Sequence, residues 1–347
     1  MVHPCYSQST FMIPENKLVA VKKALQASFG VNEFEDISQL TAGLSSALIF
    51  RIVVLGKPYL LRIITRTDEV ANPTHYYACM KPAGETGLAP HIWYAGIEDR
   101  ISITDFIEAK AFQISEARMK MPALLKRLHS LPPFPFRVNF FDFVDGLIRK
   151  IQDAKILPAS MTEDLFRLYA KIASVYPRNI QDMVSCHNDL KPENILFDGD
   201  RVWLVDWEAA FLNDRYMDLV VVGNFLVKSD QEEKDYLKKY FDEDMNEYHH
   251  ARFFLMSQVV HMSYFTFLLL QVSAAGKLIE LNSVIPDFRE YHNQMWAGKI
   301  TLENNSARQQ YALVHMQQLR HNLQTKRFDE SLYIVSNNHL QKKPIGA

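Results

Sequence analysis

The stretch that decides the fold of this chain is HNDLKPENILFDGDRVWLVDWEAAF, residues His187–Phe211. Within it, two β-rich runs, ILF and RVWLV, flank the turn-forming sequence Asp198-Gly199-Asp200, which predicts a tight antiparallel hairpin. Counting back along the ladder from this turn brings Asn194 opposite Val205, within one residue of Asp206. An amide and a carboxylate are therefore expected to converge at the open end of the hairpin.

Asn194 and Asp206 would supply two oxygen ligands of the kind that suits Mg²⁺, which completes its shell with water and phosphate oxygens. Asp189 precedes Asn194 in the same loop, where it can accept the proton of a substrate hydroxyl during phosphoryl transfer. This ordered set predicts a site for Mg²⁺ and ATP with Asp189 as the base. The alternative is a polar loop in which Asp189 caps a neighbouring element and Asp206 forms an ion pair.

The same stretch resembles the catalytic loop of the kinase-like phosphotransferases. HNDLKPEN fits their pattern H-x-D-x-x-x-x-N, and Asp206 stands where their second metal-binding Asp stands. The resemblance implies that His187 braces the loop by hydrogen bonding and that Lys191 approaches the transferred phosphate. It also implies ATP and Mg²⁺ as cofactors.

The residues after Asp206 resemble the choline and ethanolamine kinase family, within the aminoglycoside phosphotransferase superfamily. They fit the pattern D-x-E-x-x-x-x-N-x-x-x-x-D, with Glu208, Asn213 and Asp218 at its later positions. By that resemblance, Asp218 would hold the catalytic loop by hydrogen bonding and Glu208 would lie near the acceptor. A helix cap or a surface position is the alternative for Glu208 and Asn213.

The N-terminal part resembles the nucleotide-binding half of such kinases. LTAGLSSALIFRI is similar to the choline kinase phosphate loop L-x-G-G-x-x-N-x-x-F, with Ala42 and Ser46 in place of a Gly and the Asn. Gly43 would let the backbone approach phosphate, and Ser45 and Ser46 can donate hydrogen bonds to it. An ordinary hairpin turn is the alternative.

Arg62 alternates with Leu60 and Ile64 on one strand face, so a guanidinium stands in an apolar row and requires a partner. By resemblance it takes the position of the phosphate-contacting basic residue, and a surface arginine at a strand end is the alternative. The helical glutamate expected to pair with it falls near Tyr76, where no acidic residue stands. Glu69 and Glu85 are the possible substitutes.

The stretch TDFIEAKAF, Thr104–Phe112, resembles the linker between the lobes, whose backbone binds adenine. This resemblance assigns Asp105, Phe106 and Ile107 to the cofactor site. LLKRLHSLPPFP, which follows, resembles a helix-and-turn signature common in the superfamily.

The acceptor site is expected to be aromatic, because the fixed cationic head of choline needs an aromatic cage or a carboxylate. The candidate residues, besides Glu208, are Trp207, Tyr216, His261, Tyr264, Phe265 and Trp296. A place in the hydrophobic core is the alternative for all of them. The predicted acceptor is choline, ethanolamine or a related amino alcohol; the alternatives are an aminoglycoside or thiamine kinase, or a regulatory pseudokinase that binds nucleotide.

The distribution of β-rich and helical patterns predicts an α+β, bilobal, protein-kinase-like fold. Strand-like runs cover 35–40, 47–55, 59–65, 91–96 and 100–106, after an opening helix at 16–28; Asn72-Pro73 opens a weak helical segment that Pro82 and Gly84 interrupt. Helical patterns dominate from Ala111 onward. We therefore expect a small N-terminal nucleotide-binding lobe with an antiparallel sheet at 1–107, a larger and mainly helical catalytic lobe at 108–335, and a tail at 336–347.

Composition limits the partners. The chain of 347 residues carries 38 Lys and Arg against 40 Asp and Glu, without a basic run, which argues against nucleic acid or an anionic membrane. Its three cysteines show no metal-ligand or disulfide spacing, which favours the reducing cytoplasm. The segment Phe253–Gly276 lacks charged residues, but its polar side chains predict a buried core helix without membrane insertion. The oligomeric state, monomer or homodimer, stays open.

Overall fold

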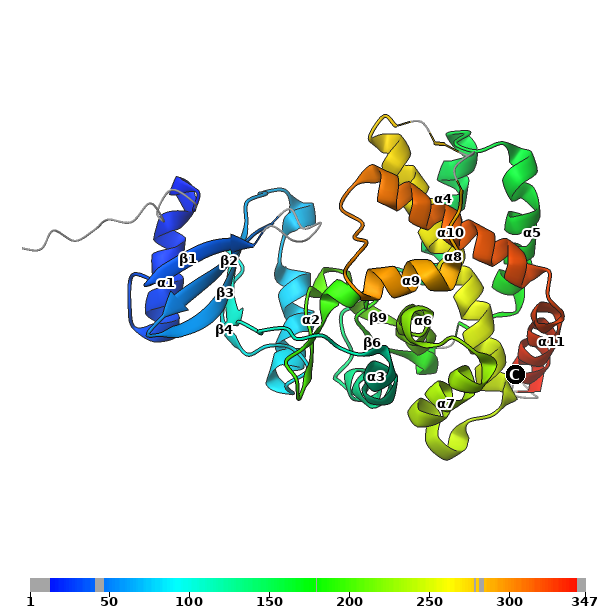
Figure 1. Cartoon of the computed structure of the whole chain (residues 1–347), viewed down its shortest axis with the longest axis horizontal. Helices are drawn as coiled ribbons and strands as arrows, with labels where there is room; N and C mark the ends of the chain where they lie inside the picture. The colour runs from blue at the N-terminus through cyan, green and yellow to red at the C-terminus, as the bar shows by residue number, and fades with distance from the viewer. Residues whose placement is uncertain (1–12, 41–46, 179, 278, 281–283, 342–347) are drawn as a thin grey trace, which may run out of the picture. The chain divides into compact units, whose positions relative to one another are not determined.

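The computed structural model describes residues 13–40, 47–178, 180–277, 279–280 and 284–341. The chain forms two compact units, one from Met1–Ala111 with Ile195–Glu208 and the other from Phe112–Asn194 with Ala209–Ala347. Figure 1 shows a sheet in the first unit and a body of helices in the second. This confirms the predicted α+β class with an antiparallel N-terminal sheet and a mainly helical remainder. The predicted lobe boundaries stay predictions.

The first unit is built on a five-stranded antiparallel sheet of order β1-β2-β3-β5-β4. The strands are β1 (Asp36–Leu40), β2 (Ala47–Val54), β3 (Lys57–Ile64), β4 (Ile92–Gly96) and β5 (Ile101–Asp105). Helix α1 (Leu18–Phe29) packs its buried side chains into one core with Leu61 and Ile63 of β3. Because side chains alternate along a strand, Arg62 points to the opposite face.

Helix α2 (Thr74–Glu85) follows β3 and runs through Pro82 to its end. The expected interruption at Pro82 and Gly84 is therefore wrong. Pro82 lies in the last turn of the helix, where its carbonyl accepts hydrogen bonds from the backbone N–H and the hydroxyl of Thr86. Pro82 removes only the one N–H that would bond to the carbonyl four residues earlier, and the helix ends three residues after it.

The hairpin of β7 (Ile195–Phe197) and β8 (Val202–Leu204) has the predicted register, with Ile195 opposite Leu204 and Phe197 opposite Val202. Asp198 sets the turn: its Oδ1 accepts the N–H groups of Asp200 and Arg201, each at 2.8 Å, and its Oδ2 accepts Trp203 Nε1 at 2.7 Å. The hydrogen bond from the Arg201 amide, with these others, lowers the pKa of Asp198 to about 2. The local sequence thus closes the hairpin.

The hairpin belongs to the first unit although its sequence lies far from the other strands. Leu204 N donates to Leu88 O at 2.8 Å, and Lys110 N donates to Phe197 O at 2.6 Å. These backbone bonds fix the segment that carries Asp206 and Glu208 beside the sheet.

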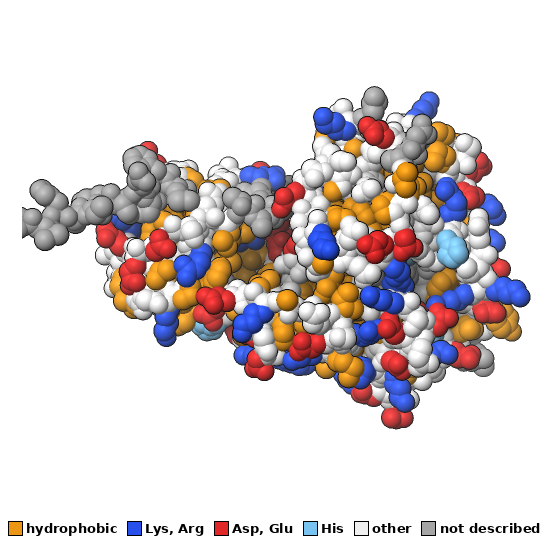
Figure 2. Space-filling model, viewed as in Figure 1, with side chains coloured by type: hydrophobic (Ala, Val, Ile, Leu, Met, Phe, Trp, Pro, Cys, Tyr) orange, Lys and Arg blue, Asp and Glu red, His pale blue; other side chains and the backbone are white. Residues whose placement is uncertain are grey.

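The second unit is helical, apart from a two-stranded antiparallel sheet that the sequence analysis did not assign, β6 (Met183–Cys186) with β9 (Phe211–Asp214). Its helices are α3 (Ile114–Leu128), α4 (Phe140–Asp153), α5 (Ala159–Val175), α6 (Arg215–Leu226), α7 (Asp230–Phe241), α8 (Glu247–Ala274), α9 (Phe288–Trp296), α10 (Asn305–Leu323) and α11 (Lys326–Gln341). Figure 2 shows basic and acidic side chains interspersed over the visible face of this unit.

Helix α8 is the centre of the second unit, in contact with α4, α6, α10 and α11. Among the described residues it is the one helix long and apolar enough to cross a membrane, and 78% of its apolar window is buried within the protein. This confirms the predicted buried core helix. Its Arg252 is buried in ion pairs with Asp214 at 2.6 Å and Asp182 at 2.7 Å.

We predict that Gly223→Ala lowers the free energy of unfolding by about 1–3 kcal/mol, because a Cβ on α6 would stand 2.9 Å from Phe253 Cζ on α8. Denaturant unfolding measures the change. Gly146→Ala on α4 is the matched control, since the atom nearest to its Cβ lies 4.0 Å away. Adding Phe253→Leu to Gly223→Ala should recover part of the loss. Equal effects of the two alanines would contradict this close approach of α6 and α8.

Candidate functional site

The loop that begins at His187 is held by a carboxylate on the first turn of α6. Asp218 is 0% exposed, its Oδ2 accepts the N–H of His187 at 2.8 Å, and its Oδ1 accepts the N–H of Asn188 at 2.7 Å. A carboxylate that is buried this completely requires such donors. The loop backbone and the Asp218 side chain therefore fix each other.

Asn188 holds an uncommon backbone conformation between these contacts, with a φ of 64°. Its Nδ2 donates to Ala209 O at 3.0 Å, and its Oδ1 accepts from Asn213 Nδ2 at 2.8 Å. A left-handed residue other than glycine persists only where its surroundings hold it. The side chains of Asn188 and Asn213 provide that support and direct the next residue, Asp189.

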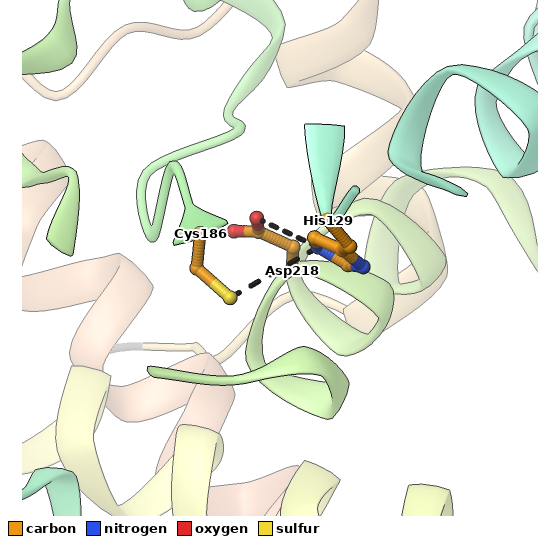
Figure 3. Close-up of side chains that lie close together, drawn as sticks. All are labelled: His129, Cys186 and Asp218. Carbon is orange, nitrogen blue, oxygen red and sulfur yellow. Dashed lines mark hydrogen bonds and ion pairs between the residues drawn. The ribbon is translucent and has the colours of Figure 1, made fainter. Parts of the chain in front are cut away.

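His129 and Cys186 surround the same carboxylate, and Figure 3 shows the two side chains and Asp218 close together. His129 Nε2 lies 3.2 Å from Asp218 Oδ2, and its Nδ1 lies 2.6 Å from the hydroxyl of Tyr240. An Nε2–H that donates to Asp218 leaves Nδ1 to accept from Tyr240. The sequence analysis cited the motif that contains His129 without giving this residue a role.

The ligand atoms of His129, Cys186 and Asp218 lie within 4.8 Å of one another, a spacing that a metal ion could also bridge. Burial and the neighbouring Asp218 carboxylate raise the pKa of the Cys186 thiol well above its ordinary value, however, and a metal requires the thiolate. Both Asp218 oxygens already accept loop N–H groups. We assign the cluster to support of the loop.

Asp189, Lys191 and Asn194 come together in the loop. Lys191 Nζ lies 2.7 Å from Asp189 Oδ2, and Asn194 Nδ2 donates to Asp189 O at 2.7 Å and to Asp189 Oδ2 at 3.0 Å. These bonds use the amide nitrogen, so the amide oxygen of Asn194, the atom that a metal would bind, is not committed to Asp189. The Asp189 carboxylate is partly exposed and can meet a ligand.

Aromatic rings and a second carboxylate lie near Asp189. Burial, and then the Asp189 and Glu193 carboxylates, raise the pKa of Tyr264 on α8. The ring of Tyr264 lies 5.6 Å from that of Tyr311 on α10, whose pKa is raised by burial and by the same groups. Desolvation, together with Asp189 and Glu303, raises the pKa of Glu193. The half-buried Tyr264 therefore lies close enough to these carboxylates to interact with them electrostatically.

The other predicted acceptor residues have different surroundings. Trp207 and Tyr216 are each 1% exposed and Phe265 is fully buried, so these rings offer no open face. Trp207 Nε1 donates to Leu204 O at 3.2 Å, whereas the ring of Tyr216 packs on the Arg252 guanidinium. Trp296 is half-buried, donates from Nε1 to Phe112 O at 2.7 Å and lies near Phe225.

His261 belongs to a cluster of buried histidines. Its Nδ1 lies 2.8 Å from Nδ1 of His315, and His292 Nε2 lies 3.1 Å from the hydroxyl of Tyr311. Burial lowers the pKa of His261 and of His292 to about 3, and burial with the neighbouring histidines lowers the pKa of His315 well below its ordinary value. The cluster is neutral at physiological pH and backs the ring of Tyr264, which stacks on His315 at 4.8 Å.

Arg62 lies in the first unit beside two carboxylates of the segment that follows β8. Its side chain is 5% exposed, its NH2 pairs with Glu208 Oε1, and its NH1 lies 3.6 Å from Asp206 Oδ1. Burial opposes the charge, but Tyr76, Asp206 and Glu208 together raise the pKa of Arg62 above its ordinary value. The structure thus places Glu208, which was predicted near the acceptor, against Arg62.

Asp206 has the properties of a cation ligand. Its φ is 64°, and its buried Oδ1 accepts no hydrogen bond from the described residues. Asp206 and Glu208 carry two negative charges against the single positive charge of Arg62. An unsatisfied carboxylate oxygen in a surplus of negative charge fits a hard divalent cation.

The residues that were predicted to bind the nucleotide differ in their surroundings. Gly43, Ser45 and Ser46 fall outside the described residues. Asp105 ends β5, and its Oδ1 accepts Trp93 Nε1 at 2.7 Å. Phe106 and Ile107 are half-buried in the irregular segment that follows, and the Arg51 guanidinium lies over the Phe106 ring at 5.5 Å.

Comparison with known proteins agrees with this fold. A family model described as the phosphotransferase enzyme family matches residues 36–254. Protein LicA of Haemophilus influenzae is 37% identical over 76 residues, which is 22% of this chain and 27% of that relative. The chain thus matches about a quarter of the length of this curated relative.

Two solved structures show the likeness over nearly the whole chain. A choline/ethanolamine kinase family protein from Mesorhizobium loti has a TM-score of 0.65 at 20% identity, covering 92% of this chain and 99% of that one. A spectinomycin phosphotransferase in complex with ADP and spectinomycin has a TM-score of 0.54 at 12% identity, covering 86% and 98%. At these identities the likeness establishes the fold.

We predict that acid destabilises the fold through the buried histidines. The pKa values of His261 and His292, about 3 when folded, lie below the ordinary 6.5, so the unfolded chain binds more protons as pH falls. Stability should be complete above pH 6.5 and decline toward pH 3, by up to ~1.4 kcal/mol per pH unit for each histidine.

Denaturant unfolding at stepped pH measures this slope. The double variant His261→Gln/His292→Gln should flatten it, whereas His321→Gln, at an exposed position of α10, serves as the control and should leave it unchanged. An equal slope in the double variant and the parent would contradict the assignment of buried neutral histidines.

Proposed function

The chain belongs to the phosphotransferase enzyme family, and from this premise we propose that it is an ATP-dependent small-molecule kinase. The proposed reaction moves the γ-phosphate of ATP to a hydroxyl of choline, ethanolamine or a related amino alcohol. The observation that carries the proposal is the loop in which Asp189 is partly exposed while Asp218 holds the backbone just before it.

Asp189 is the proposed base. In this role its carboxylate accepts the proton of the acceptor hydroxyl and orients the oxygen toward the phosphorus. Lys191, paired with Asp189 at 2.7 Å, is placed to turn toward the transferred phosphoryl group, whose negative charge it would partly neutralise. His187 and Asp218 act as positioning residues, since the backbone of His187 is bonded to the Asp218 carboxylate.

Mg²⁺ is the proposed metal, held by Asn194 and Asp206. The amide oxygen of Asn194 is not committed to Asp189, and Asp206 Oδ1 is buried without a hydrogen bond from the described residues. The ion, when bound, would neutralise charge on the ATP phosphates. The residues' own part is to offer oxygen ligands on the two sequence segments that flank the hairpin.

ATP would be bound mainly by the first unit. Arg62 is the proposed phosphate contact, because its guanidinium is buried beside Asp206 and suits planar phosphate recognition. The loop with Gly43, Ser45 and Ser46 is proposed to cradle phosphate, and the backbone at Asp105–Ile107 to meet adenine. The spectinomycin phosphotransferase of similar fold, solved with ADP, supports an adenine nucleotide.

The acceptor is proposed to be a cationic amino alcohol. Tyr264 presents a half-buried aromatic ring near the carboxylates of Asp189 and Glu193, and the buried ring of Tyr311 packs beside it at 5.6 Å. An ammonium group is attracted both by carboxylates and by aromatic faces. Of the residues predicted for this site, Tyr264 has the strongest support and Trp296 is half-buried, whereas burial speaks against Trp207 and Tyr216.

We predict that the protein forms phosphorylated product from Mg-ATP and an amino alcohol, and that Asp189→Ala lowers turnover by roughly two to four decades with nucleotide binding retained. Mass spectrometry of reactions with choline, ethanolamine, thiamine and spectinomycin measures the product. Asp153→Ala, at the exposed end of α4, is the matched control and should react as the parent does.

A phosphocholine or phosphoethanolamine signal that disappears in Asp189→Ala supports the proposal. If only spectinomycin or thiamine is phosphorylated, the acceptor is not an amino alcohol, and the proposed acceptor class is wrong. No product from the panel, with ATP still bound, would instead favour the regulatory pseudokinase. A cytoplasmic location and a monomeric or homodimeric state stay predictions.

A further inference from the structure

The carboxylate that the sequence analysis expected on helix α2 as the partner of Arg62 is replaced by an aromatic ring. The Arg62 guanidinium carbon lies 5.1 Å from the centre of the Tyr76 ring, so position 76 does face the arginine. Burial, which outweighs the influence of Arg62, raises the pKa of Tyr76 to about 12, so its hydroxyl is neutral at physiological pH. Tyr76 covers the guanidinium without balancing its charge.

The charge is balanced from another part of the chain. Glu208 lies 146 positions after Arg62, and its Oε1 accepts a hydrogen bond from the Arg62 NH2. Asp206, two residues before Glu208, contributes the second carboxylate at 3.6 Å. An arginine whose side chain is only 5% exposed depends on such partners, because an isolated buried charge is strongly unfavourable.

We infer that Glu208 is the positioning residue that aims Arg62 at the nucleotide phosphates, in place of a carboxylate on α2. The inference rests on the proposed ATP-dependent function. Tyr76 packs on the face of the guanidinium, at the position of α2 where a carboxylate was expected. Glu208, after β8, supplies the carboxylate instead.

The segment that carries Glu208 is suited to this role. Residues Trp207–Ala209 form a short 3₁₀ turn, and Trp207 is buried with its Nε1 bonded to Leu204 O at 3.2 Å. The Trp207 side chain anchors the turn to the β7–β8 hairpin. Asp206 and Glu208 are therefore carried by one anchored segment, so that the phosphate-contacting arginine and the proposed metal ligand are held together and independently of α2.

The inference predicts that Glu208→Gln weakens binding of ADP about tenfold in the absence of metal, because the guanidinium loses its anchor while Asp206 is intact. Isothermal titration with ADP in a chelating buffer measures the affinity. Adding Tyr76→Glu to Glu208→Gln should restore most of it, because a carboxylate at position 76 faces Arg62. A merely structural role for Glu208 would give no such rescue.

Glu69→Gln and Glu85→Gln are the controls, since these two acids are the substitutes considered from the sequence, and both should bind ADP as the parent does. Parent-like ADP affinity in Glu208→Gln, or a loss in either control, would overturn the inference. A parent that binds no ADP would count against the proposed nucleotide function itself, and a second measurement then decides the pairing.

That second measurement is thermal unfolding of a double-mutant cycle between Arg62→Met and Glu208→Gln. Glu208→Gln alone should lower Tm by several degrees, and the loss should shrink when Arg62 is also replaced, since no buried charge is left without its partner. Additive shifts in Tm would overturn the inference, whatever the nucleotide data show.

Discussion

The structure of the candidate site depends on one buried carboxylate. Asp218 has no access to solvent and meets its need for hydrogen bonds with the backbone N–H groups of His187 and Asn188 and with His129. Because both sides of these contacts would otherwise be unsatisfied, neither the helix nor the loop can move alone. The direction of Asp189 follows from that constraint.

In the first unit the buried charge is positive, and it too requires partners that fix the surrounding segments. Arg62 is buried on the face of β3 opposite the α1 core, and its burial is possible because Glu208 and Asp206 come to it on the turn after β8. In both units a buried charge therefore selects its partners and fixes a functional segment. Residues proposed for base, metal and phosphate roles thus acquire defined positions before any ligand binds.

The features that could be predicted from the sequence depend mostly on residues close together in the chain. The turn at Asp198 closes the β7–β8 hairpin in the expected register. Alternation along β3 indicated that Arg62 needs a partner, and the resemblance to the phosphotransferase superfamily is confirmed by the family match. The pairing of Arg62 with Glu208 escaped prediction because it joins residues 146 positions apart. Strand β9 is short and pairs with a segment before the loop, so no local pattern identified it.

Burial decides which of the aromatic candidates can contact an acceptor, and burial cannot be predicted from the residue type alone. Trp207, Tyr216 and Tyr264 are all aromatic, yet the first anchors a turn, the second packs on Arg252 and the third lies near Asp189. His261 was selected for its spacing from Tyr264 on one helix face, and its neighbour His315 comes from α10. The packing of α8 against α10 decides that Tyr264 can contact a ligand whereas His261 lies behind it and supports it.

The central claim is that Asp218 positions the loop for catalysis, and the turnover of Asp218→Asn tests it most directly. The amide keeps the size of the side chain but presents an N–H toward a loop N–H. The account predicts a folded protein that binds ADP within a few fold of the parent and turns over on the order of 10²-fold more slowly, with faster hydrogen exchange at His187 and Asn188. Parent-like turnover in a folded Asp218→Asn protein would contradict it.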